Sequence, residues 1–167
     1  MDLTQKVLVL PHVCGIEIDL SATIEPTKEP SLQGFYNTLV QNSTAVPVYF
    51  TPSKGRLSES AEDTRSGIKY TQTLQLEFPS NDPMRAKRIS DYLKVKYVYI
   101  KLSTDMIVFF GRNDYNQNSE PKVKMSSNEK TTQITYTCQS MFSYGFTNGS
   151  FSFGFPLEFP INFYNLL

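Results

Sequence analysis

Three segments of this chain alternate apolar and polar side chains with a period of two, and this pattern constrains the fold most strongly. The segments are residues 16–25, 68–78 and 131–139, and their even-numbered positions carry most of the apolar side chains. A period of two is typical of a strand with one face on the core and the other in water. The pattern predicts a mostly β (α+β) fold, an antiparallel β-sandwich or a partly closed barrel, with the even-numbered faces buried.

The two faces of these predicted strands differ in chemistry. The expected water-facing positions of the first segment are Glu17, Asp19, Ser21, Thr23 and Glu25. The expected core positions of the other two are Ile68, Tyr70, Leu74, Leu76, Phe78, Ile134, Tyr136 and Cys138.

One helix is expected over about residues 83–93. Asp82 can cap free backbone amides, and Pro83 fits the first turn without losing a hydrogen bond. The predicted buried stripe consists of Ala86, Ile89, Tyr92 and Leu93. The water-facing positions are Arg85, Lys87, Arg88 and Asp91.

Three further segments have weaker patterns. Residues 97–110 predict a hairpin of two apolar strands around a tight turn. Residues 46–50 predict a short edge strand, because Pro47 cannot donate to a ladder. Residues 31–40 have helical spacing that Gly34 weakens, so a second helix stays open there.

Two polar segments, 51–67 and 111–130, are predicted to be long loops within a single β-rich domain of residues 1–150. Loops of this length are usually functional or disordered. We expect them to contact neighbouring subunits. The candidate contact residues are Arg56, Arg65, Arg112, Asp114 and Tyr115.

The C-terminal end is rich in aromatic residues and almost uncharged. The last 29 residues hold nine of the 22 aromatic residues and one charged side chain, Glu158. Gly154, Pro156 and Pro160 exclude a long helix. Residues 151–167 are therefore expected to form an extended arm that docks on another subunit, or alternatively on its own domain. The predicted subunit interface is Phe151, Phe153, Phe155, Leu157, Phe159, Ile161, Phe163 and Tyr164.

Charge and composition argue against several classes of function. Lys and Arg number 16, and Asp and Glu also number 16, so no excess of positive charge favours nucleic acid or an anionic membrane. No apolar stretch approaches the roughly 20 residues of a membrane span. One His and two Cys make a zinc site an unfavourable hypothesis. We expect no cofactor, no metal and no enzymatic activity.

Other candidate sites have simpler structural explanations. Glu17 and Asp19 could be paired catalytic acids, but their spacing is also that of a water-facing strand. His12 and Cys14 could form a nucleophilic pair, but no third orienting group is identifiable. Cys14 and Cys138 are expected to be buried free thiols. Basic residues near the predicted helix, interleaved with tyrosines, could form a surface that binds nucleic acid. The same composition is typical of the water-facing side of an ordinary amphipathic helix.

The predicted order from Tyr70 to Phe146 is strand, helix, hairpin, polar loop and strand. This order resembles small structural proteins of tailed bacteriophages, found in tails, necks and baseplates. The resemblance rests on Tyr70-Thr-Gln-Thr-Leu-Gln-Leu, Phe109-Phe110-Gly111 and Ile134-Thr-Tyr-Thr-Cys138. It covers a little under half of the chain. It implies a protein of the virion, assembled in the host cytoplasm, that forms rings or a tube with copies of itself and neighbouring virion proteins.

The expected function is therefore that of a structural subunit assembled by edge-strand pairing and arm docking. The alternative is a carbohydrate- or ligand-binding β-sandwich module. Residues 114–118, Asp-Tyr-Asn-Gln-Asn, could stack on a sugar and hydrogen-bond to it.

Overall fold

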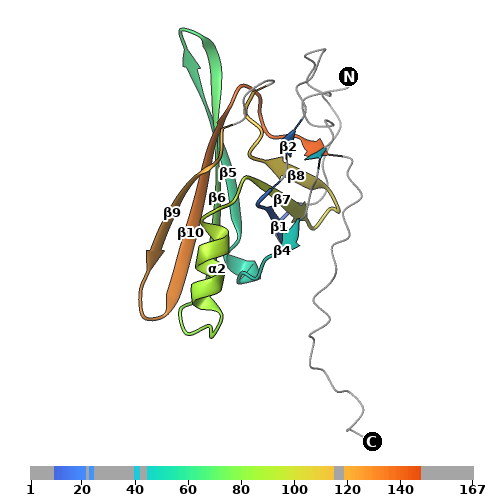
Figure 1. The fold of residues 1–167 in the computed structure, drawn as a ribbon. Coiled ribbons are helices and arrows are strands. Elements are labelled where there is room, and N and C mark those ends of the chain that lie inside the picture. The colour runs from blue at the N-terminus through green and yellow to red at the C-terminus, as the bar shows by residue number, and fades with distance from the viewer. Residues whose placement is uncertain (1–9, 22, 25–39, 42–44, 115–118, 148–167) are drawn as a thin grey trace, which may run out of the picture.

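The computed structural model describes residues 10–21, 23–24, 40–41, 45–114 and 119–147 (Figure 1). It confirms a mostly β fold with two antiparallel sheets and one helix in a sandwich-like arrangement. The predicted helical segment 31–39 and the arm 151–167 lie outside the described residues. The described part contains no helix that is long and apolar enough to span a membrane.

The five-stranded sheet has the strand order β11-β8-β7-β1-β4. Its strands are β1 (Val13–Asp19), β4 (Val46–Pro47), β7 (Tyr97–Leu102), β8 (Ile107–Phe110) and β11 (Phe146–Thr147). The predicted hairpin is confirmed as β7 and β8, and the predicted edge strand is confirmed as β4.

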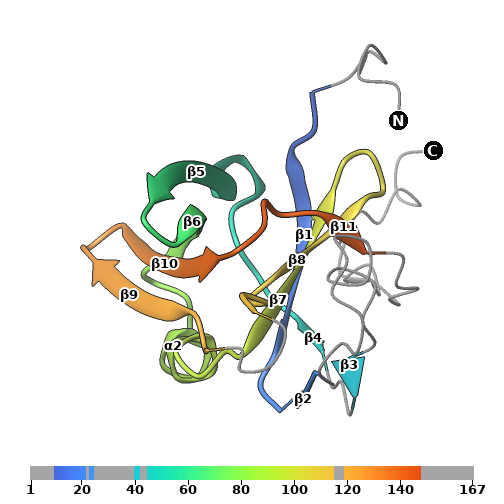
Figure 2. The ribbon, with the colours of Figure 1, turned by 90° about the horizontal axis from the view of Figure 1, so that it is seen from above.

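The four-stranded sheet has the order β5-β6-β10-β9. Its strands are β5 (Arg56–Thr64), β6 (Gly67–Pro79), β9 (Lys122–Ser127) and β10 (Thr131–Ser140). Two short strands, β2 (Thr23–Ile24) and β3 (Val40–Gln41), pair separately, and a 3-10 turn, η1 (Pro52–Lys54), precedes β5. Figure 2 shows the four-stranded sheet on one side of the molecule and the five-stranded sheet on the other.

The core lies between the inner faces of the two sheets. In the middle of β6 and β10 the even-numbered positions are buried and the odd-numbered ones are half-buried, as the alternation predicts. The fully buried members of this core are Leu74, Leu76, Phe78, Val98, Ile100, Val108, Phe110, Ile134 and Tyr136, each at 0% exposure. Ile68 is an exception at 56% exposure, because it lies at the outer end of β6, beside the turn to β5.

The prediction of two long loops is wrong for two stretches. Residues 56–64 form β5, which pairs with β6 from Arg56↔Gln75 to Thr64↔Gly67. Residues 122–127 form β9, which pairs with β10. The hydrogen bonds that join an edge strand to its neighbour come from the backbone and do not require apolar side chains. An edge strand can therefore be almost wholly polar, and its sequence then resembles that of a loop.

The helix is shorter than predicted and begins later. It spans Arg85–Tyr92 and is labelled α2. The N-cap residue is Met84 rather than Asp82, and its side chain makes no capping hydrogen bond. Asp82 instead binds the residue before the helix, because its Oδ1 accepts the N–H of Met84 at 2.9 Å. Tyr92 is buried, and its ring packs edge-on against Phe78 with the centroids 5.8 Å apart.

The predicted buried stripe of the helix is only partly correct. Ala86 and Leu93 are exposed, whereas Arg85 and Arg88 are half-buried. Arg85 donates hydrogen bonds to Thr132 and Ser127, which lie at the polar end of the four-stranded sheet. The helix therefore contacts a partly polar surface, which the apolar spacing of its sequence does not indicate.

Candidate assembly interface

β5 is one outer strand of the four-stranded sheet. It is nine residues long, and within the described part of the chain only β6 pairs with it. Its exposed side chains are Arg56, Ser58, Ser60, Ala61, Glu62 and Asp63. A strand in this position presents a row of backbone N–H and C=O groups that a further strand could bind.

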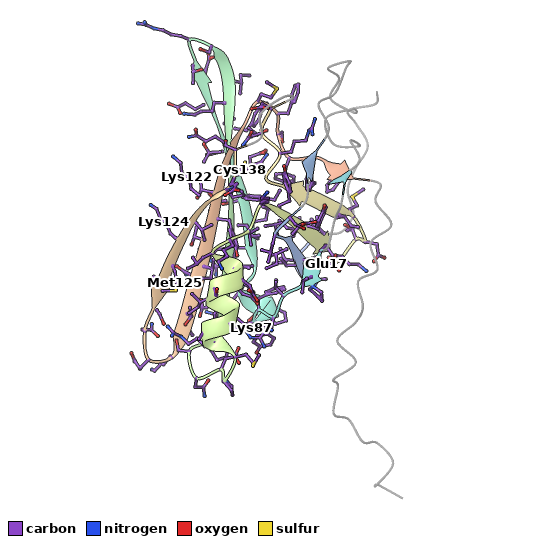
Figure 3. All side chains as sticks on the ribbon, viewed as in Figure 1. Glu17, Lys87, Lys122, Lys124, Met125 and Cys138 are labelled. Carbon is purple, nitrogen blue, oxygen red and sulfur yellow. The ribbon has the colours of Figure 1, made fainter. Side chains whose placement is uncertain are left out.

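β9 is the opposite outer strand of the same sheet. It spans six residues, and β10 is its only paired strand among the described residues. Lys122, Lys124 and Met125 are exposed along it (Figure 3), Met125 at 44%. Val123 is half-buried and packs against the core. This edge is basic, whereas β5 carries two Glu, one Asp and one Arg.

The hairpin of β5 and β6 projects beyond the rest of the molecule (Figure 1). Residues Arg65 and Ser66 form its two-residue turn, and Gly67 follows with a φ of 109°. The hydroxyl of Thr64 donates to the carbonyl of Gly67 at 2.6 Å. Lys69 and Glu62 form an ion pair across the hairpin at 2.9 Å.

Glu59 fixes β5 to the chain that leaves β10. Its Oε1 accepts the N–H of Tyr144 at 2.7 Å and the Nε2 amide of Gln72 at 3.0 Å. Its Oε2 accepts the hydroxyl of Ser143 at 2.6 Å. The edge strand is thus attached to the segment between β10 and β11, which ends on the five-stranded sheet.

The predicted loop contacts occupy different environments. Arg56 and Arg65 are exposed on the β5–β6 hairpin. Arg112 is 2% exposed, so the prediction of an accessible contact is wrong at this position. The polar segment around it enters the protein interior where β8 ends. Asp114 is half-buried, and Tyr115 lies outside the described residues.

An open groove of about 590 Å³ lies where the start of β1 meets β5 and β6. Its basic side chains are His12 and Arg56, and no carboxylate lines it. Its apolar lining comes from Pro11, Val13, Leu57, Leu102 and Tyr144. The groove can accommodate a small molecule by volume.

The hypothesis of a His12–Cys14 nucleophile gains no support. Both residues are exposed, and β1 has an irregular register between Val13 and Gly15. A bulge interrupts the alternation that would place the two side chains on one face. Cys14 is an exposed thiol, against the prediction that it is buried, whereas Cys138 is a buried one. Burial raises the pKa of Cys138 to about 11.

Glu17 and Asp19 were expected to face water, and this expectation is wrong. They are 3% and 0% exposed. β1 lies between β7 and β4, so Glu17 is opposite Tyr99 and Asp19 is opposite Tyr97. Both tyrosines are also buried, in a second apolar cluster with Ile107 and Phe109. Desolvation raises the pKa of Glu17.

Asp19 on this acidic face accepts hydrogen bonds from two backbone groups. The Oδ1 of Asp19 accepts the N–H of Ser21 at 3.0 Å, and its carbonyl accepts the N–H of Lys96 at 2.9 Å. The described residues contain no group of three or more His, Cys, Asp or Glu side chains arranged to hold a metal ion.

Sequence reasoning missed the residues that define both sheet edges. The polar composition of segments 51–67 and 111–130 predicts loops at Lys122, Lys124 and Glu62. The alternation of Lys122, Val123, Lys124 and Met125 is the one sequence feature that could have indicated β9.

Comparisons with protein-family models, with curated proteins and with solved structures found no match to this chain.

Proposed function

We propose that this protein is a structural subunit of an oligomeric particle whose copies join through the edges of the four-stranded sheet. The observation that carries the proposal is that β5 and β9, at nine and six residues, are both long outer strands. The other sheet differs, because its outer strands β4 and β11 have two residues each. Pairing a second strand to such an edge adds main-chain hydrogen bonds without a specialised pocket.

The attachment of β5 favours pairing. The three hydrogen bonds to Glu59 hold the strand in place before a partner arrives. A pre-ordered edge loses less conformational entropy on binding than a flexible segment does. Each net hydrogen bond contributes about 0.5–1.5 kcal/mol, so several in a row could support a stable contact.

The finer proposal places the subunit in a phage tail or neck, as a ring or tube component of the virion. It rests on the resemblance of residues 70–146 and on the sheet edges. The arm 151–167 would then dock on a neighbouring subunit and contribute apolar contact area. Burying one Phe side chain contributes about 1.5–3 kcal/mol. The proposal includes no enzymatic activity and no cofactor.

The solution mass of the full-length protein tests the general proposal. Light scattering on a sizing column should give a mass above that of one 19.0 kDa chain, and the mass should rise with concentration. A single-chain mass at every concentration that can be reached would contradict the proposal.

The groove favours a second candidate function, the binding of a small ligand. Its two basic side chains and its apolar lining suit an anion with an apolar body, such as an aromatic carboxylate. Calorimetric titration with benzoate should then release heat that benzamide does not, and Arg56→Gln should abolish the difference. Equal responses to both compounds would exclude this candidate.

A further inference from the structure

We infer that the copies join head to tail, with β9 of one subunit added to β5 of the next. This inference rests on the proposed function and specifies its contact. It follows from the directions of the two strands, the orientation of their backbone groups and their charges.

The strand directions permit a continuous sheet. Each neighbouring pair in β5-β6-β10-β9 is antiparallel. Three successive reversals leave β5 and β9 antiparallel to each other. A second copy placed alongside therefore brings its β5 antiparallel to β9, and the two four-stranded sheets continue as one antiparallel sheet.

The free hydrogen-bonding groups on the two edges can be located from the hairpins. Directly after β9, the N–H of Asn128 donates to the carbonyl of Thr131 at 2.9 Å. Antiparallel strands alternate between bonded and non-bonded pairs. Counting back from Asn128, Met125 directs its N–H and C=O away from β10.

The same count applies to β5. The two-residue turn makes Thr64 and Gly67 its closing pair. Alternation from this pair directs the N–H and C=O of Ala61 away from β6. Ala61 is opposite Tyr70, and Met125 is opposite Ile134, so both outward-bonding residues lie on the core side of the sheet. The two edges are therefore complementary in their backbone hydrogen-bonding groups. When these groups pair, the core sides of the two sheets also lie on the same face of the combined sheet.

The charges favour this contact. With Met125 opposite Ala61 of the next copy, Lys124 lies opposite Glu62 on the outer face. A shift of two residues places Met125 opposite Glu59 and brings Lys122 opposite Glu62. Opposite charges across neighbouring strands stabilise pairing, and like charges destabilise it. Glu62 is well placed for this role, with its side chain 69% exposed.

Two symmetric registers bring like charges together. Two β9 strands centred on Lys124 would place Lys124 of both copies opposite each other, and two β5 strands centred on Glu59 would do the same with Glu59. The head-to-tail contact has neither repulsion, and the proline variants distinguish it from the other symmetric registers. A heterologous contact of this kind closes into a ring when the rotation between copies allows, and otherwise forms a filament.

Two proline variants test the inference. Met125→Pro blocks β9, and Ala61→Pro blocks β5, each by removing an N–H that points away from its own sheet. Each variant alone should be monomeric, because it keeps only one active edge. An equal mixture should form heterodimers, because the intact β5 of one variant can pair with the intact β9 of the other. Met125→Leu and Ala61→Ser keep the amide and should assemble like the wild type.

The outcomes separate this inference from the proposed function. If Met125→Pro assembles alone while Ala61→Pro does not, copies pair through β5 only, so the head-to-tail contact is wrong and the oligomeric function stands. If both variants assemble alone as well as the wild type does, neither edge forms the contact. If the wild type itself is monomeric, the proposed function fails.

Charge exchange provides a second test that does not depend on proline being tolerated. Lys122→Glu with Lys124→Glu should weaken association several-fold, as should Glu62→Lys. The combination of all three should restore association. Lys87→Glu, on the exposed side of α2 (Figure 3), is the matched control and should have no effect. Failure of the combined variant to recover would overturn the pairing of β9 with β5.

Discussion

The carboxylate of Glu59 accepts the backbone N–H of Tyr144 at 2.7 Å, across 85 positions of sequence. This bond joins the outer strand β5 to the segment that carries the chain from β10 to β11. The same carboxylate binds Gln72, which is 2% exposed, and Ser143. The edge that we propose for assembly is therefore anchored to the body of the protein.

Replacing Glu59 should destabilise the fold. Glu59→Ala removes the acceptor of three hydrogen bonds and leaves the buried amide of Gln72 with a weaker set of partners. We expect a loss of about 2–4 kcal/mol in the free energy of unfolding, measured by urea denaturation. Ser60→Ala changes an exposed position on the same strand and should change this free energy by less than about 0.5 kcal/mol. Equal effects of the two substitutions would contradict the anchoring role.

Gly111 and Gly67 form a matched pair for testing backbone strain. Both have a positive φ, 113° and 109°. A Cβ at Gly111 would lie 2.8 Å from the carbonyl oxygen of Lys96, whereas a Cβ at Gly67 would meet nothing within 4 Å. We expect Gly67→Ala to cost about 1 kcal/mol and Gly111→Ala about 2–4 kcal/mol in unfolding free energy. Similar costs would contradict the close approach at Gly111.

The two thiols should differ in reactivity. Cys14 is exposed, whereas burial raises the pKa of the Cys138 thiol to about 11. Because the thiolate is the reactive form, iodoacetamide should alkylate Cys14 in the folded protein and reach Cys138 only in urea. Peptide mass spectrometry measures both sites, and Cys14→Ser should leave the folded protein almost unlabelled. Equal labelling of both thiols in the folded protein would contradict the structure.

Glu17 should make stability depend on pH in an unusual direction for a carboxylate. Burial raises its pKa in the folded protein, so the folded state holds this proton more tightly than the unfolded state. The stability that it contributes is present below the unfolded pKa and is lost as the pH rises through the folded pKa. Glu17→Gln should therefore raise the unfolding free energy at pH 7, and its advantage should shrink on acidification.

Glu62→Gln is the control for this pH dependence. Its hydrogen bond to Lys69 lowers the pKa of Glu62, so any contribution is lost as the pH falls. This substitution should not stabilise the protein at pH 7. If Glu17→Gln also fails to stabilise the protein at pH 7, this result would contradict the burial of Glu17.

The sequence predicts well those strands that have one face on the core. β6 and β10 alternate because Leu74, Leu76 and Ile134 point inward while the intervening residues do not. The prediction from alternation is wrong at Glu17. A period of two shows which residues share a face of the strand, but it does not show whether that face is covered by other parts of the protein. The side chains of Tyr97 and Tyr99 share the face of Glu17, and this relation exists only after β1 and β7 pair.

The assembly edges could not be predicted from the same pattern. β5 and β9 bury few side chains, so their sequences resemble loops. Their strand structure comes from backbone bonds to β6 and β10, the neighbouring strands in their hairpins, and hydrophobic spacing does not report backbone bonds. The helix face was misassigned for a related reason, since Arg85 binds Thr132 and Ser127 only in the folded protein.

Hydrogen exchange at the two edges tests the central claim most directly. The backbone amides of Ala61 and Met125 point away from their own sheet, so water reaches them in a single subunit. In the proposed assembly the same amides bond to the neighbouring copy. We predict that exchange at both positions is fast in dilute protein and slows markedly at concentrations where the mass is multimeric. Fast exchange at both amides in the multimer would contradict assembly through these edges.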